Sequence, residues 1–305
     1  MNKYCFITEE NDEGLRLDNY LSNLFETLSR SQIQALIKAG NVLVDQAIKK
    51  SSYNLKIGEK IELELSEKPN DIIEPQNIPL VIVYEDDNML VVNKPSGMLT
   101  HPTSTERENT LVNALMYKYG ENLSDINGHL RRGILHRLDR NTSGLLMVAK
   151  NNKAHEFLAN QIKERTATKR YLAVIKGAIR NESGVINLPI GRNPNHPKMA
   201  VVEGGRPSVT EFKVLKRFRD CTYLELNLIT GRTHQIRVHL GHMSHPIIND
   251  TLYGAGQFKV KTQEQVLQSY KLAFRKPFTS HVIELEIAPD EKITKVLNYL
   301  ENKKQ

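Results

Sequence analysis

The sequence of 305 residues predicts an α+β protein, in which a small α/β unit precedes a larger domain built on a mixed, mainly antiparallel sheet. Strand patterns dominate from about residue 78, and most connections between them are short and hairpin-like, which is typical of antiparallel pairing. Residues 66–77 are polar, contain two prolines and have no apolar period. We therefore expect a small domain over residues 14–66, a linker over residues 67–77 and a main domain over residues 78–300.

The small domain is expected to contain two helices and two strands. Apolar residues from Leu17 to Leu24 recur at helical spacing, and Asp18 lies near the start, where the helix dipole favours a carboxylate. A second helix is expected to end before Gly40. Alternating apolar and polar residues predict short strands at residues 42–45 and 60–65.

The main domain is expected to begin with a β-hairpin. Its two strands, residues 80–84 and 89–93, flank a polar turn. A helix over residues 110–119 is expected to end at Gly120. The remaining elements are an apolar strand at 145–149, an amphipathic helix at 152–163 and further strands at 170–176, 208–215, 222–229 and 280–287.

Charge and composition limit the class of protein. Net charge is +7, and residues 1–75 hold 9 basic and 13 acidic side chains, so the excess of positive charge lies in the rest of the chain. A basic main domain favours an anionic partner. No apolar run approaches the roughly 20 residues that span a bilayer, and no signal pattern opens the chain, so we expect a cytoplasmic protein. Cys5 and Cys221 are expected to be free thiols.

The first segment that can carry chemistry is residues 134–146. Its polar centre presents one carboxylate, Asp139, between Arg137 and Arg140. The turn-forming residues 141–144 can tie this loop to itself through bonds from side chain to backbone. A surface turn with ordinary ion pairs is the alternative interpretation, because most neighbouring Asp and Arg residues are only that.

The second segment is residues 230–240. We expect Thr233 to cap a helix on which Ile236, Leu240 and Met243 share one face, with Arg232 and Arg237 at the corner where a strand meets this helix. A helix that packs on the sheet and keeps its arginines in solvent is the alternative.

Four histidines in and after this segment raise the question of zinc. Their spacings are five, three and three residues, with no His-Glu-x-x-His and no nearby cysteine, whereas a helical zinc site commonly uses an i, i+4 pair. We therefore expect no metal site, and a metal-dependent hydrolase is disfavoured. Packing or contact with RNA is favoured for these residues, which are His234, His239, His242 and His245.

Several motifs together resemble the RluA-like family of pseudouridine synthases. HRLD at 136–139 with TSG at 142–144 is similar to the catalytic motif of that family. Three further blocks match in the same order, at residues 92–97 (VNKPSG), 169–173 (KRYLA) and 231–239 (GRTHQIRVH). Residues 14–65, with RLD at 16–18 and GNVLV at 40–44, resemble an S4 RNA-binding domain. The resemblance implies the pseudouridine synthase fold and an enzyme that converts specific uridines of structured RNA to pseudouridine.

The resemblance also implies the roles of individual residues. Asp139 is implied to be the catalytic carboxylate, because breaking a glycosidic bond calls for a carboxylate that faces the developing positive charge or acts as nucleophile. Arg237 is implied to be its partner and to keep it ionised through a planar, bidentate contact. Tyr171 is implied to stack on the base and to act as general base, and Ile236 to contact the other face of the base.

Further residues are expected to bind substrate. Arg137 is a candidate to occupy the space that a flipped base leaves, and His136 and Arg232 are expected beside it. Arg232 is also the rival of Arg237 as partner of Asp139. In the S4-like unit the RNA-binding candidates are Arg16, Arg30, Lys38, Lys49 and Lys50.

The resemblance further implies no cofactor and no metal, since the isomerisation needs neither redox chemistry nor a group donor. The expected partner is RNA, with 23S ribosomal RNA of the large subunit suggested by analogy, no membrane, and a monomer favoured. An alternative from another class is an S4-type RNA-binding or ribosome-assembly protein whose large domain is inactive. The joint presence of Asp139, Tyr171 and Arg237 argues against that alternative.

Overall fold

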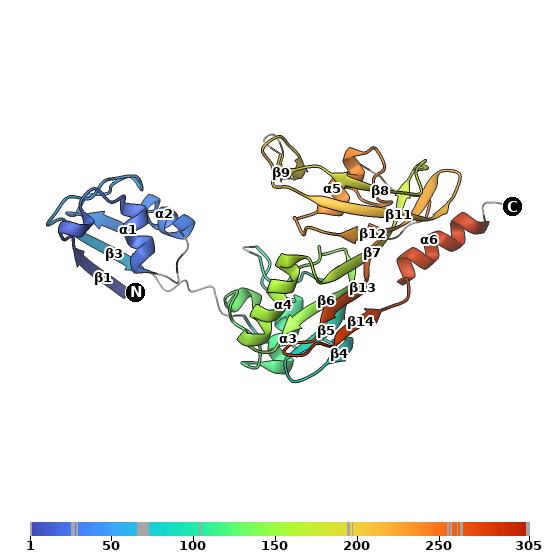
Figure 1. The fold of residues 1–305 in the computed structure, drawn as a ribbon, viewed down its shortest axis with the longest axis horizontal. Helices are drawn as coiled ribbons and strands as arrows, with labels where there is room; N and C mark the ends of the chain where they lie inside the picture. Colours follow the sequence, from blue (N-terminus) through green and yellow to red (C-terminus); the bar gives the residue numbers. More distant parts are fainter. Residues whose placement is uncertain are drawn as a thin grey trace. The chain divides into compact units, whose positions relative to one another are not determined.

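A computed structural model describes residues 2–25, 28, 30–65, 73–103, 105–193, 196, 198–254, 256, 258–260, 262 and 265–302. The chain divides into two compact units, Met1–Asp71 and Ile72–Gln305 (Figure 1). Of the expected linker, residues 67–72 lie outside the described residues. Beyond them Ile73 packs into the core of the second unit, and the backbone N–H of Gln76 donates to the carbonyl of Asn113 at 3.0 Å. Within the described ranges, no helix combines the length and the apolar character needed to cross a membrane.

The first unit packs two helices on a small antiparallel sheet. The helices are α1 (Leu17–Leu24) and α2 (Arg30–Lys38), and a 3₁₀ turn, η1 (Glu10–Asp12), precedes them. The sheet has the order β1-β3-β2, with β1 at Asn2–Ile7, β3 at Lys60–Leu65 and β2 at Val42–Val44. Leu17, Leu21, Ile33 and Ile61 form the centre of its core. The expected helices and strands are confirmed, and β1 is an additional strand that the sequence pattern did not predict.

One large sheet organises the second unit and confirms the predicted fold class. Its strand order is β4-β5-β6-β13-β7-β12-β11-β8, with β14 also paired to β13. All its pairings are antiparallel except that of β6 with β13. The strands are β4 (Ile82–Glu85), β5 (Met89–Lys94), β6 (Ser143–Ala149), β7 (Thr168–Lys176), β8 (Ser183–Asn187), β11 (Val209–Arg217), β12 (Cys221–Leu228), β13 (Leu267–Arg275) and β14 (Val282–Glu286). A separate two-stranded sheet pairs β9 (Ile190–Arg192) with β10 (Met199–Val201).

Both faces of the sheet are covered at β5 and β6. Leu146 and Val148 belong to the same core as residues of α3 (Leu111–Tyr119), whereas Leu145 and Met147 pack with Leu158 of α4 (Asn152–Glu164). Successive side chains of a strand point to opposite faces, so α3 and α4 lie on opposite sides of this part of the sheet. Burial on both faces explains why β6 is a continuous apolar run instead of an alternating one.

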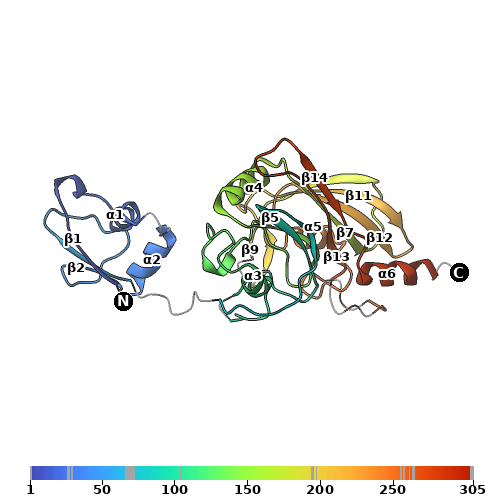
Figure 2. The ribbon, with the colours of Figure 1, turned by 90° about the horizontal axis from the view of Figure 1, so that it is seen from below.

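Two further helices cover the other strands. The helix α5 (Gln235–His242) lies against β10 and β11, and α6 (Glu291–Asn302) lies beside β7 and β13, as Figure 2 shows. A short 3₁₀ helix, η2 (His129–Arg131), precedes the loop that leads to β6. The prediction that Thr233 caps α5 is wrong. The cap residue is His234, which has a left-handed backbone (φ 57°), and the side chain of Gln235 accepts hydrogen bonds from Thr230 and Arg232.

Candidate active site

The loop that carries Asp139 is fixed by hydrogen bonds that its backbone carbonyls accept. It runs from His136 to Thr142 and leads directly into the buried strand β6. Its four consecutive carbonyls at residues 138–141 all accept hydrogen bonds, from groups on four different segments. The donors are Thr100 to Leu138 (2.8 Å), the backbone of Thr142 to Asp139 (3.0 Å), Lys94 to Arg140 (3.0 Å), and both Ser96 (2.9 Å) and Lys292 (3.0 Å) to Asn141. The loop is therefore held in one conformation before any substrate binds.

Gly144 allows this loop to continue into β6. It pairs with Ser269 of β13 in the parallel part of the sheet and has φ 113°. A Cβ atom at this position would lie 2.0 Å from the carbonyl oxygen of Ser269. Only glycine fits such a close approach of two backbones. The polar end of β6, and with it Asp139, is placed against β13 for this reason.

Asp139 contacts Arg237, and Arg237 in turn contacts a second aspartate. The Nη1 atom of Arg237 lies 3.0 Å from Oδ2 of Asp139. The two parallel bonds of the guanidinium fork are made to Asp250, from Nε at 2.7 Å and from Nη2 at 2.9 Å. The expected pairing of Arg237 with Asp139 is thus present, but the expectation of a bidentate contact is wrong, because Asp250 takes the fork.

Asp250 is also held by its own surroundings. Its side chain is fully buried, and Oδ1 accepts from the backbone N–H groups of Leu252 and Tyr253, both at 3.2 Å. Hydrogen bonds to the two aspartates raise the pKa of Arg237, although its burial acts in the opposite direction. Arg237 therefore stays charged and donates from its Nη1 to Asp139.

His234 and Tyr253 complete the wall behind Asp139. Nε2 of His234 lies 3.7 Å from Oδ1 of Asp139, and its Nδ1 is 2.9 Å from the hydroxyl of Tyr253. The guanidinium of Arg237 lies over the Tyr253 ring, 5.0 Å from its centroid. Burial lowers the pKa of His234, so its ring is neutral at neutral pH. The sequence did not identify Asp250 or Tyr253 as site residues, and for His234 it favoured packing or contact with RNA over a role as metal ligand.

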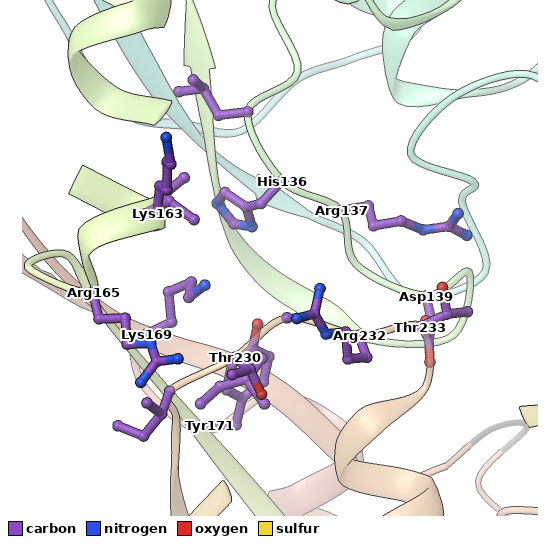
Figure 3. Close-up of a pocket in the computed structure, with 15 residues that line it drawn as sticks. His136, Arg137, Asp139, Lys163, Arg165, Lys169, Tyr171, Thr230, Arg232 and Thr233 are labelled. Atoms are coloured by element: carbon purple, nitrogen blue, oxygen red, sulfur yellow. The ribbon is translucent and has the colours of Figure 1, made fainter. Parts of the chain in front are cut away.

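A cavity of about 420 Å³ opens beside this group (Figure 3). Its size falls within the roughly 300–1,000 Å³ typical of pockets for small ligands. Asp139 and Tyr171 line it, and Tyr171 also lines a smaller adjoining hollow with Ile236. The predicted catalytic residues and Ile236 are thus brought together from the loop before β6, from β7 and from α5.

Tyr171 and His136 form uncharged walls of the cavity. Burial raises the pKa of Tyr171, which is only 4% exposed, and the nearby carboxylate of Asp139 adds to the effect. Its phenol therefore keeps its proton at neutral pH. Burial, together with the positive charge of Lys169, lowers the pKa of His136 to about 3. Nε2 of His136 accepts from the backbone N–H of Met147 at 3.1 Å, which fixes its ring.

Arg137 and Arg232 are two further arginines of the motifs that line the cavity. Arg137 is exposed and lines both the cavity and the hollow. Arg232 also lines both, and its Nε donates to the carbonyl of Pro207 at 3.4 Å. Arg237, and not Arg232, makes the contact with Asp139.

The basic residues singled out in the first unit have different surroundings. Asp18 is fully buried and accepts hydrogen bonds from the guanidinium groups of Arg16 and Arg30 and from Gln34. These bonds hold the pKa of Asp18 far below its usual range. The side chains of Arg16 and Arg30 stay 41% and 52% exposed. Lys38 and Lys50 are exposed, and the ammonium of Lys49 lies 5.0 Å from the ring centroid of Tyr53.

The four histidines have separate partners instead of a common centre. His239 contacts Thr210 and the carbonyl of Leu188, and His245 contacts the carbonyl of Lys176. Within the part of the chain that the structure describes, no three His, Cys, Asp or Glu residues are grouped as metal ligands would be.

Comparison with known protein families gives two matches. The family model described as RNA pseudouridylate synthase matches residues 88–242, which include Asp139, Tyr171 and Arg237. The S4 domain model matches residues 15–61.

Individual proteins are similar over nearly the whole chain. An uncharacterized RNA pseudouridine synthase of Bacillus subtilis (strain 168) is 39% identical over 98% of this chain and 99% of its own length. Ribosomal large subunit pseudouridine synthase D of Pseudomonas aeruginosa is 38% identical over 90% of this chain and 84% of its own. Among solved structures, human RNA Pseudouridylate Synthase Domain Containing 1 is 26% identical with a TM-score of 0.57, covering 75% of this chain and 98% of that one.

Proposed function

We propose that this chain, which belongs to the RNA pseudouridylate synthase family, uses Asp139 as the catalytic residue to isomerise uridines of large-subunit ribosomal RNA. The observation that carries the proposal is the position of Asp139. Of the residues that line the cavity it is the one carboxylate, and it sits on a loop in which the carbonyls of residues 138–141 accept hydrogen bonds.

The proposed reaction needs no cofactor. The bond between C1′ and N1 of the uridine breaks, the uracil turns, and C5 joins to C1′. C5 then loses a proton and N1 gains one, so the product has the same atoms as the substrate. No electron and no chemical group enters or leaves.

Asp139 is placed to act on the sugar. Breaking the glycosidic bond leaves positive charge at C1′, and a carboxylate stabilises that charge or attacks the carbon. Arg237 donates to Oδ2 of Asp139 at 3.0 Å and so orients its carboxylate. Because Asp250 holds the Arg237 fork, this orientation does not depend on substrate.

Tyr171 and Ile236 are proposed to hold the base from its two faces. Both are about 4% exposed, and both border the hollow beside Asp139. Tyr171 is also proposed to serve the removal of the C5 proton. Because burial raises its pKa, the phenol can accept that proton only by passing its own proton on. His136 is proposed to line the cavity as an uncharged side chain.

The RNA itself is proposed to bind through cations at the opening and on the S4 domain. A base in folded RNA must leave its stack to reach Asp139, which costs a few kcal/mol. Exposed Arg137 is proposed to fill the space left behind, with Arg232 beside it. Arg16, Arg30, Lys38, Lys49 and Lys50 are proposed to contact phosphates, which position RNA without reading its sequence. Large-subunit ribosomal RNA is favoured because similar proteins carry that substrate in their names.

Release of tritium from uridine labelled at C5 tests this proposal. We expect purified protein to release tritium from large-subunit ribosomal RNA of cells that lack the gene. Asp139→Asn is expected to release none while it keeps its fold and RNA affinity. Asp87→Asn, an exposed aspartate of the β4–β5 turn, is the matched control and should match the unmodified protein. Substantial release by Asp139→Asn would remove Asp139 from its role. No release by the unmodified protein would favour an RNA-binding protein with an inactive large domain.

A further inference from the structure

Lys169 is a buried cation that the proposed chemistry does not use. It lies on β7, two residues before Tyr171, and is only 5% exposed. It lines the cavity that contains Asp139. Among the residues that the structure describes, none forms a hydrogen bond or an ion pair with its ammonium group.

Such a group destabilises the protein that carries it. Removing an ammonium from water costs several kcal/mol unless an anion or several hydrogen bonds replace the lost hydration. Burial lowers the pKa of Lys169, and no carboxylate offsets this effect. The cost is reasonable if a ligand brings the missing anion, since binding sites commonly carry groups that are unfavourable in the free protein.

The surroundings of Lys169 also favour an anion. Five cationic side chains line the cavity, against the single carboxylate of Asp139: Arg137, Lys163, Arg165, Lys169 and Arg232. In Figure 3, Lys163, Arg165 and Lys169 lie on the side of the cavity away from Asp139 and Thr233. Lys163 and Arg165 are exposed at the end of α4. Gly231 faces Lys169 and contributes no side chain there: a Cβ atom at this position would lie 3.8 Å from the ammonium nitrogen.

We infer that Lys169 binds a backbone phosphate of the RNA strand next to the uridine being isomerised, with Lys163 and Arg165 at the rim of the same subsite. This inference rests on the proposed function in that the ligand is RNA. The target nucleoside then enters with its sugar toward Asp139 and with a neighbouring phosphodiester toward Lys169. Lys169 is thus a substrate-binding residue that fixes how far the strand enters the cavity.

Two other roles are possible outcomes of the test. Lys163 and Arg165 could serve only the negative end of the α4 dipole, but Lys169 lies on a strand and has no such role. Lys169 could instead stabilise negative charge on the uracil after the glycosidic bond breaks. In that case its removal would lower the rate of the chemical step and leave the electrostatics of RNA binding unchanged.

Salt dependence of RNA binding separates these roles. Dissociation constants for protein-free large-subunit ribosomal RNA are measured at KCl concentrations from about 50 to about 300 mM, which include the physiological ionic strength of about 150 mM. All variants carry Asp139→Asn as well, so that the RNA is not modified during the measurement. Lys169→Met is compared with Lys169→Arg and with Lys153→Met, an exposed lysine of α4 outside the cavity. Thermal unfolding of the same variants without RNA gives the second measurement.

The inference predicts a specific pair of results. Lys169→Met should reduce the slope of log Kd against log salt by about 0.7–0.9, the value of one phosphate contact. Lys169→Arg and Lys153→Met should keep the slope. Without RNA, Lys169→Met should unfold at a higher temperature than its parent, because an unpaired buried charge is gone; a structural lysine would give the opposite result.

An unchanged slope for Lys169→Met would overturn the inference, whether or not turnover falls. A lower melting temperature would also overturn it, since it would show that Lys169 supports the fold. This binding experiment needs no turnover, so absence of tritium release would contradict the proposed function without deciding the role of Lys169.

Discussion

At the scale of single residues, the site depends on an arginine shared between two carboxylates. Asp250 accepts from Nε and Nη2 of Arg237 inside the protein, and Asp139 accepts from Nη1 of Arg237 at the cavity. The side chain of Asp250 is fully buried, whereas that of Asp139 is 15% exposed, so Asp139 is the one of the two carboxylates that a ligand can reach. Because Asp250 fixes the guanidinium of Arg237, Arg237 can orient the carboxylate of Asp139 without moving with it.

Substitution of Arg237 tests this view. Arg237→Lys keeps the charge but cannot bind Asp250 through two parallel bonds, so turnover at saturating RNA should fall sharply while RNA affinity changes little. Arg237→Ala should be worse and should also lower the free energy of unfolding by about 3–5 kcal/mol, because the Asp250 carboxylate stays buried without its partner. Single-turnover rates and urea unfolding measure the two effects.

Arg232→Ala is the control for that experiment. Arg232 borders the same cavity but has no contact with Asp139, so its loss should weaken RNA binding and leave the rate at saturating RNA nearly unchanged. If Arg232→Ala is inactive and Arg237→Ala is close to the unmodified protein, the wrong arginine has been assigned to Asp139.

At the scale of elements, the loop that carries Asp139 depends on a strand and a helix far from it in sequence. Lys94 ends β5 and Lys292 lies in α6, and their ammonium groups bind the carbonyls of Arg140 and Asn141. Gly144 then brings β6 against β13. The pairing of β6 with its neighbours in the sheet therefore fixes the direction in which the loop enters β6.

Gly144→Ala tests the close approach of β6 and β13. A Cβ atom there meets backbone, which cannot move aside, so we expect a loss of about 3 kcal/mol or more in the free energy of unfolding. Gly97→Ala is the matched control, because Gly97 also has a positive φ (85°) but open space around it. Its cost should be only the backbone strain of about 1–2 kcal/mol. Equal losses for the two variants, measured by urea unfolding, would show that β6 and β13 are not so close.

The strand β13 is one of the elements that the sequence did not predict, and its residues show why. β13 is buried, yet it contains Gln268 and Ser269, whose side chains bond to the carbonyls of Ala288 and Leu145. Neither an apolar run nor a clean alternation marks such a strand. In contrast, β6 and α4 have strong periodic patterns, and both were predicted close to their observed bounds.

The candidate site also contains residues that local sequence patterns do not reveal. Asp139 could be identified from its local motif, whereas Asp250 acts only through a side chain brought to it by the fold. His234 was visible in the same motif as Arg237, but its neighbour Tyr253 lies 19 residues away. Contacts of this kind have no local sequence signal.

At the scale of the whole molecule, each of the two units has hydrophobic core residues of its own. The core of the first unit, with Leu17 and Ile33, shares no residue with the cores of the second. Ile73 already belongs to the second unit. Each unit therefore contains the apolar contacts that it needs to fold.

Deletion of residues 1–66 tests whether the second unit folds without the first. We expect the remaining fragment to unfold cooperatively near the temperature of the full chain, because its cores are intact. Its affinity for large-subunit ribosomal RNA should fall, since Arg16, Arg30 and the lysines of the S4 domain are lost. Calorimetry and RNA titration measure these effects. A fragment that fails to fold would show that the boundary is wrong.

Pseudouridine mapping in cells tests the central claim most directly. Large-subunit ribosomal RNA is mapped from cells that carry the gene, from cells that lack it, and from deleted cells that express either the unmodified protein or Asp139→Asn at equal levels. The account predicts that one or more pseudouridines disappear on deletion and return with the unmodified protein only. It would be contradicted if Asp139→Asn restored them, or if deletion changed no pseudouridine in any RNA of the cell.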